Sequence, residues 1–160
     1  MLDVLILAGL YTLRILAGGV AARVPVSPWL LAFSMFFFLS LAYAKRFSEI
    51  LANGSDIAPS KNGRGYYAMD RDLFQTLGPI SGYISVLILA LYINGREVTE
   101  LYRKPQYLWF ICPLLLFWIT RIWLLTQRGE MNEDPVDFAI RDKNSYLIGV
   151  LVLLTILVSL

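Results

Sequence analysis

The stretch SPWLLAFSMFFFLSLAYAKRFSEI, residues 27–50, decides the fold. The serine that opens it is a good helix N-cap, and the proline that follows suits the first helical position. The sequence then stays apolar until its first charges, Lys45 and Arg46. A helix needs roughly 20 mostly apolar residues to cross a bilayer. Residues 28–52 therefore predict a transmembrane helix with its charges at one end.

Four further segments have a similar length and character. They cover residues 2–22, 70–93, 105–127 and 135–160. The apolar part of the last segment is short for a full crossing. We therefore predict an all-α fold, a polytopic transmembrane bundle of about five helices that forms one domain over residues 1–160.

The composition agrees with a membrane protein and excludes several kinds of chemistry. Hydrophobic residues make up 58% of the chain and charged residues 16%, with a mean hydropathy of +0.61. A soluble domain has about 25% charged residues. A net charge of +2, with no basic run interleaved with aromatics, gives no sign of a nucleic-acid partner. Histidine is absent and Cys112 is the single cysteine, so any chemistry must use carboxylates, Lys, Arg, Tyr or a hard cation.

Lysine and arginine are distributed unequally between the two ends of the predicted bundle. One end carries nine: Lys45, Arg46, Lys61, Arg64, Arg71, Arg121, Arg128, Arg141 and Lys143. The other end carries four: Arg23, Arg96, Arg103 and Lys104. Cytoplasmic loops of membrane proteins carry the excess of these residues. The larger group is therefore predicted to face the cytoplasm.

The end of the second helix carries a cluster that suits phosphate. Lys45 and Arg46 lie three to four residues before Glu49, so the three side chains share one side of the helix. Arginine offers a fork to phosphate oxygens, lysine a point charge, and glutamate a ligand for Mg²⁺. The alternative interpretation is a helix end that extends its cations to the membrane interface and forms an internal salt bridge.

Charges inside the predicted helices form a second group of candidates. Arg14 lies near the middle of the first helix, where a charge costs at least about 2.5 kcal/mol on insertion scales. We expect such a side chain to face the bundle interior and to have a partner. Arg121, inside the fourth helix, is a weaker example.

An acidic stretch, GEMNEDPVDFAIRD, covers residues 129–142. Its first carboxylates, Glu130, Glu133 and Asp134, are interpreted as a solvated turn in which Asp134 caps the next helix. Asp137, Arg141 and Asp142 begin a helix that enters the membrane. These three are the better functional candidates.

Four stretches, in this order, resemble the C-terminal half of the UbiA superfamily of membrane transferases: LYTLRILAGG, SPWLLAFSMFFFLSLAYAKRFSEI, GRGYYAMDRDLFQTLGPISGYISVLILALYI and DPVDFAIRDK. The segment AKRFSE is similar to the sixth helix of the decaprenyl-phosphate phosphoribosyltransferase branch, and DPVDFAIRD to the turn before its last helix. The resemblance covers nearly the whole chain. It implies that the predicted helices are the last five of nine, around a cavity that opens to the cytoplasm.

The resemblance also implies an activity and a site. Enzymes of this branch transfer a phosphoribosyl group from phosphoribosyl diphosphate to a polyprenyl phosphate, with Mg²⁺ held on the diphosphate. The diphosphate and Mg²⁺ site is predicted at Lys45, Arg46 and Glu49, with Glu49 as the metal ligand. Substrate-binding side chains are predicted at Arg14, Tyr43, Asp137, Arg141 and Asp142.

Two departures from the family pattern shape this prediction. The first aspartate-rich motif, of the type NDxxDxxxD, belongs to an earlier helix that these residues lack. The second, often DxxxD, is replaced by the Lys45 cluster, which favours phosphoribosyl transfer over aromatic prenylation. Apolar sequence begins directly after Asp3, which indicates a piece of a longer protein. The chain is therefore predicted to be inactive alone and to need an N-terminal half that carries the first motif.

Two other functions stay open at this stage. One is a prenyltransferase that moves an isoprenoid onto an aromatic or other acceptor. The other belongs to a different class, a non-catalytic membrane subunit or lipid carrier, and the missing first motif keeps it open.

Overall fold

The computed structural model describes residues 2–24, 26–52, 70–95, 98, 101–131 and 134–160, without the side chains of residues 136 and 137. Every regular element in these residues is a helix. The elements are α1 (Leu2–Ala22), α2 (Pro28–Ala52), α3 (Arg71–Ile93), η2 (Pro105–Phe110), α5 (Ile111–Gln127), α6 (Pro135–Arg141) and α7 (Lys143–Ser159). The predicted all-α, polytopic helix bundle is confirmed.

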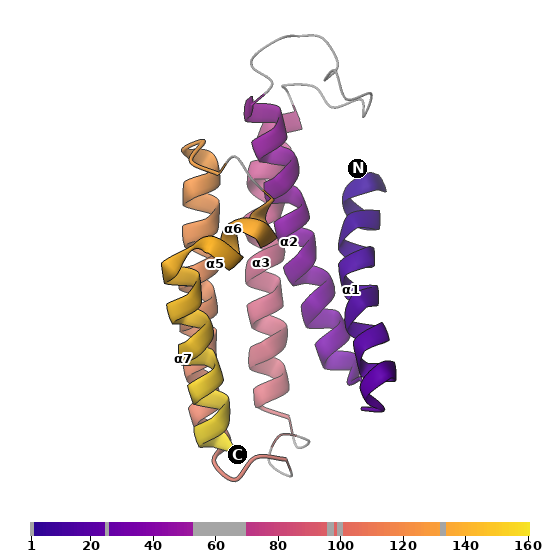
Figure 1. The fold of residues 1–160 in the computed structure, drawn as a ribbon, viewed down its shortest axis with the longest axis vertical. Coiled ribbons are helices and arrows are strands. Elements are labelled where there is room, and N and C mark those ends of the chain that lie inside the picture. The colour runs from indigo at the N-terminus through magenta and orange to yellow at the C-terminus, as the bar shows by residue number, and fades with distance from the viewer. Residues whose placement is uncertain (1, 25, 53–69, 96–97, 99–100, 132–133) are drawn as a thin grey trace.

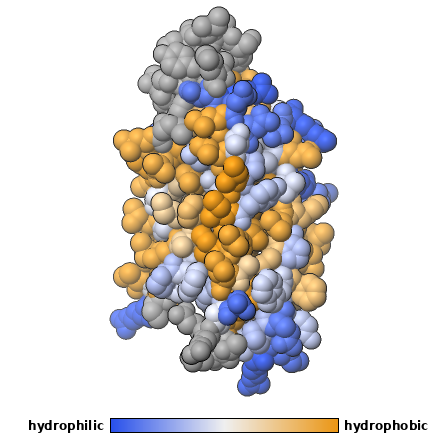
Figure 2. Space-filling model, turned by 180° about the vertical axis from the view of Figure 1, so that it is seen from behind, coloured by the Kyte–Doolittle hydropathy of each residue, from blue (hydrophilic) through white to orange (hydrophobic). Residues whose placement is uncertain are grey.

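Four of these segments are long and apolar enough to cross a membrane: Leu2–Ala22, Pro28–Ala52, Arg71–Ile93 and Pro105–Gln127. The last of them begins as the 3₁₀ helix η2 and continues as α5. Hydrophilic residues gather at both ends of the molecule, and apolar residues form a band between them (Figure 2). Such a band fits the hydrocarbon core of a bilayer.

The single helix predicted over residues 135–160 is wrong, because the chain divides it at Asp142. This residue has an extended backbone, with φ −81° and ψ 123°, and its side chain accepts a hydrogen bond from the Ser145 N–H. That is the geometry of a helix N-cap, so α6 ends and α7 begins here. The resulting α7 has 17 residues, which is short for a bilayer crossing.

The helices form a row in which α1 packs on α2, α2 on α3, α3 on α5, and α5 on α7 (Figure 1). The short α6 crosses the front of this row and contacts α2 and α7. The N-terminus and the last turn of α2 lie toward one end of the bundle, and the C-terminus lies at the other. The helix α6 thus contacts α2, which carries the lysine and arginine cluster.

The interface of α2, α3 and α5 is closely packed around Trp123. The Trp123 indole N–H donates a hydrogen bond to Ser40 Oγ at 3.0 Å, and both residues are buried. Gly78 and Gly82 of α3 leave room for α5, since a Cβ at Gly78 would lie 1.8 Å from Trp123 Cζ2. This contact holds α2 against α5 and so fixes the helix that carries the lysine and arginine cluster.

Replacing Gly78 with alanine should lower the free energy of unfolding by about 1–3 kcal/mol, the usual cost of overpacking a core. The buried Cys112, the single cysteine, can report unfolding through the temperature at which it reacts with a fluorescent maleimide. Gly9→Ala is the matched control, because no atom lies within 4 Å of its added Cβ. Equal melting temperatures for the two variants would contradict this packing.

Candidate functional site

Aromatic packing sets the orientation of the last two turns of α2. Phe47 is fully buried, and its ring packs edge-on against Trp123 at 6.1 Å between centroids. Tyr43 is also buried, and its ring lies 5.6 Å from that of Phe74 on α3. With these rings fixed against α3 and α5, the two cations of α2 point to other neighbours.

Arg46 is a buried cation that joins two helices. Its side chain is 7% exposed, and Nε lies 2.8 Å from Asp3 Oδ2 on α1. Nη1 donates a hydrogen bond to Glu49 Oε2 at 2.6 Å. The Nε contact is an ion pair by distance whose N–H is not aligned for a hydrogen bond. Removing either carboxylate would leave part of the buried guanidinium charge uncompensated, which is strongly destabilising. Both ion pairs are therefore expected to persist in the folded protein.

Lys45 points to a different neighbour, the turn before α6. Its ammonium forms an ion pair with Asp134 Oδ2, and both side chains are partly buried. The predicted solvated turn at Asp134 is wrong, because this contact, between residues 89 positions apart, partly buries its side chain. Asp134 also lies in the turn of chain that leads into Pro135, so the ion pair attaches the start of α6 to α2.

A second ion pair attaches the other end of α6. Arg121 donates two hydrogen bonds to Asp142, at 2.7 and 3.0 Å, and Asp142 also accepts bonds from the Ser145 N–H and hydroxyl at 2.8 and 2.9 Å. Burial alone would raise the pKa of Asp142, but the bonds from Arg121 and Ser145 and the charge of Arg121 lower it below its ordinary value of 3.8. These contacts stabilise the α6–α7 junction, and the predicted role of Asp142 in substrate binding stays a prediction.

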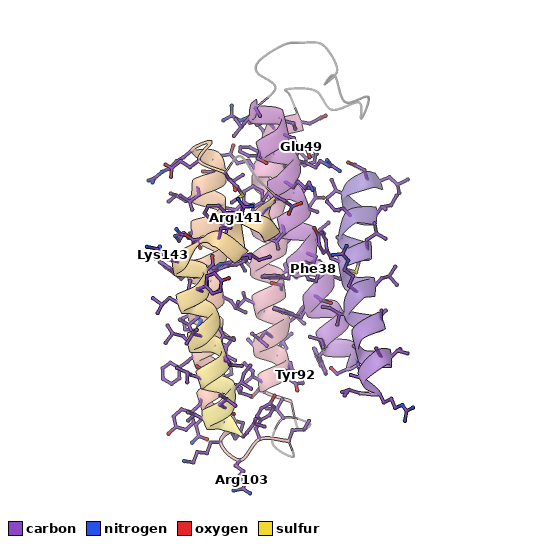
Figure 3. The ribbon with its side chains drawn as sticks, in the orientation of Figure 1. Phe38, Glu49, Tyr92, Arg103, Arg141 and Lys143 are labelled. Atoms are coloured by element: carbon purple, nitrogen blue, oxygen red, sulfur yellow. The ribbon has the colours of Figure 1, made fainter. Side chains whose placement is uncertain are left out.

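The remaining predicted residues are distributed differently. Arg14 was expected to face the interior with a partner, and this is wrong for the structure: its side chain is exposed and lies over the ring of Tyr11 at 5.4 Å. The expectation failed because α1 packs mainly on α2 and leaves its other sides open. Arg141 is exposed on α6, where Figure 3 labels it below Glu49. The side chain of Asp137 lies outside the described part of the chain.

The described carboxylates near this cluster do not by themselves gather into a metal-binding group. Among the described residues, no three acidic side chains gather as a group that could hold a metal ion. Glu49 Oε2 and Asp3 Oδ2 both contact Arg46, which opposes their use as metal ligands. Glu49 as a Mg²⁺ ligand therefore stays a prediction.

An open, mostly apolar groove adjoins α6. It has a volume of about 240 Å³, and its lining includes Phe37, Trp118, Ala139, Ile148 and Gly149. A second open groove of about 360 Å³ shares Ala139, Ser145 and Gly149 with it and continues along α7. Such a lining accepts a hydrocarbon chain and disfavours an ion. The two ends of α6 thus carry ion pairs, and its middle borders an apolar space.

Known proteins resemble this chain over nearly its whole length. The chain is 41% identical over 154 residues to y4nM, an uncharacterized protein of Sinorhizobium fredii, and 35% identical over 147 residues to nodulation protein NoeC of Azorhizobium caulinodans. It is 24% identical over 143 residues to decaprenyl-phosphate phosphoribosyltransferase of Mycobacterium tuberculosis. These matches cover 95%, 90% and 88% of the chain.

The chain spans only 30%, 47% and 44% of the lengths of these three relatives. No family model and no solved structure matches it. The chain is thus distantly similar to a transferase. It also has four helices that are long and apolar enough to cross a membrane.

Proposed function

We propose that this chain is the C-terminal part of a membrane-embedded, UbiA-type transferase that moves a phosphoribosyl group from phosphoribosyl diphosphate to a polyprenyl phosphate. The observation that carries the proposal is the pair of adjacent cations, Lys45 and Arg46, at one end of an apolar bundle. The distant likeness to decaprenyl-phosphate phosphoribosyltransferase supports it.

The cluster has the chemistry that a diphosphate leaving group needs. As the bond to ribose breaks, negative charge grows on the diphosphate, and fixed cations in a site of low dielectric stabilise that charge. Lys45 would bind a phosphate oxygen directly, and Arg46, whose Nε and Nη1 already contact carboxylates, would add a second positive charge beside it. The open apolar groove beside α6 has room for part of a lipid acceptor. Mg²⁺ dependence stays a prediction that these side chains neither require nor exclude.

The substrate assay tests the proposal against both alternatives. The chain, co-expressed with the N-terminal half of a relative, should form lipid-soluble phosphoribose from labelled phosphoribosyl diphosphate, decaprenyl phosphate and Mg²⁺. Prenylated product from a polyprenyl diphosphate and an aromatic acceptor, with no phosphoribosyl lipid, would favour the prenyltransferase. No product in either assay from a folded complex would favour a non-catalytic subunit or carrier.

We also place the cluster at the cytoplasmic face, because cations are more numerous at that end. Glu130 follows α5 at the cluster end, and Arg103 lies at the opposite end (Figure 3). In a Cys112→Ser background, Arg103→Cys should react with an impermeant thiol reagent in intact cells, and Glu130→Cys only after lysis. Labelling of Glu130→Cys from outside would reverse the orientation.

A further inference from the structure

The charges around Lys45 and Arg46 do not favour an anion as they stand. Among the described residues, the two cations already contact three carboxylates, those of Asp3, Glu49 and Asp134. A phosphate that approached either cation would compete with a carboxylate already in contact with it, in a partly buried site where charges interact more strongly than in water. One carboxylate must therefore leave its cation before a phosphate can bind there.

We infer that Asp134 is the exchangeable counter-ion, which occupies Lys45 until a phosphate group displaces it. This inference rests on the proposed function, because it assigns a role to a residue at the same site. In the ligand-free protein Asp134 supplies the negative charge for Lys45, and in the complex a phosphate oxygen supplies it. Asp134 thereby sets the affinity of the site for its phosphorylated substrate.

The other two carboxylates are less suited to exchange. Asp3 and Glu49 share one guanidinium that is 7% exposed, so removing either would leave a buried charge with fewer partners. The two cations differ, because the Lys45 side chain is 30% exposed and that of Arg46 only 7%, so water can solvate Lys45 more readily once its ion pair opens. The exchange at Lys45 therefore has the smaller desolvation cost.

Described residues on both sides of Asp134 in the sequence are buried. Met131 is buried, and its sulfur accepts a hydrogen bond from Thr126 Oγ1 at 3.4 Å. Pro135, directly after Asp134, is also fully buried. The exchange needs only another rotamer of the Asp134 side chain and no movement of these two residues. A neutral asparagine at this position should therefore leave the fold intact.

The test measures binding of inorganic diphosphate to this chain co-expressed with a cysteine-free N-terminal half of a relative, in lipid nanodiscs and in buffer with a metal chelator. The Asp134→Asn variant should bind about tenfold more tightly than the unaltered protein, because the diphosphate no longer has to displace a charge-assisted contact from Lys45. A gain in affinity is informative because damage to the fold would reduce binding. Protection of Cys112 from a maleimide confirms that each variant is folded.

A matched control and a double variant locate the effect. Glu130→Gln removes the same charge from an exposed position close to Asp134 in the sequence. It should bind diphosphate within about twofold of the unaltered protein, since an exposed charge away from Lys45 is screened by salt. When Lys45 is already replaced by methionine, adding Asp134→Asn should not raise the affinity for diphosphate. This double-mutant cycle shows whether Asp134 acts through Lys45.

The outcomes separate this inference from the proposed function. If Lys45→Met abolishes binding but Asp134→Asn binds no more tightly, the exchange is wrong and the phosphate site stands. If binding is absent throughout, or unchanged in both Lys45→Met and Arg46→Met, the phosphate site itself is wrong. Weaker binding by Asp134→Asn, only when Mg²⁺ is added, would identify a metal ligand in place of an exchangeable counter-ion.

Discussion

Arg46→Lys should lower the turnover of the assembled transferase by about 10- to 100-fold while the protein stays folded. Lysine keeps the charge but loses the planar fork, so the contact to Asp3 or to Glu49, which orients the cation beside Lys45, is lost. A charge-assisted hydrogen bond contributes about 1.5–3 kcal/mol, which is the source of that range. Single-turnover formation of the phosphoribosyl lipid, per folded molecule, is the measurement.

Two other arginine-to-lysine changes provide the controls for this result. Arg128 caps the end of α5 and is exposed, so Arg128→Lys should be silent. Arg121→Lys loses the bidentate pair with Asp142, so it should lower the melting temperature but keep the turnover of the folded fraction. Unaltered turnover in both Arg46→Lys and Glu49→Gln would return the cluster to its other interpretation, a helix end with an internal salt bridge.

The sequence was sufficient to predict the helices, because a membrane-spanning helix forms all its backbone hydrogen bonds within one segment. An apolar run of the right length is then enough to predict a span such as Pro28–Ala52. The break at Asp142 was missed because the cap and proline at Asp134 and Pro135 predict the start of one helix that continues into the apolar stretch of residues 145–160. The pattern Asp142 to Ser145, an acceptor side chain three residues before its donor, was the local sign that could have located it.

The site was only partly predictable, for a physical reason that depends on sequence distance. Arg46 and Glu49 are one turn apart on one helix, so helical geometry places them together, and the structure shows the contact. The contacts of Arg46 with Asp3 and of Lys45 with Asp134 depend on how α1 and α6 pack, which spacing cannot give. Arg14 shows the same limit, because its surroundings depend on which helices flank α1.

The 160-residue chain expressed alone should form no phosphoribosyl lipid, although it should insert into membranes. The electrostatics carry this prediction. A diphosphate brings several negative charges into a site of low dielectric, and they need comparable positive charge. Lys45 and Arg46 are already compensated by three carboxylates, and the described residues gather no metal-binding group. The first aspartate-rich motif of the UbiA pattern would have to supply the missing Mg²⁺.

The packing of α1 leads to the same expectation. Only 11% of the residues in the most apolar 18-residue stretch of α1 are buried. Arg14 is exposed near the middle of this helix, at a membrane depth where a charge is costly. A second set of helices would cover this face, whereas the isolated chain should self-associate or accumulate poorly. The assay compares the chain alone with the chain co-expressed with the N-terminal half of a relative, at equal amounts of folded protein. Product from the co-expressed pair alone is expected, and product from the chain alone would contradict both the electrostatic and the packing argument.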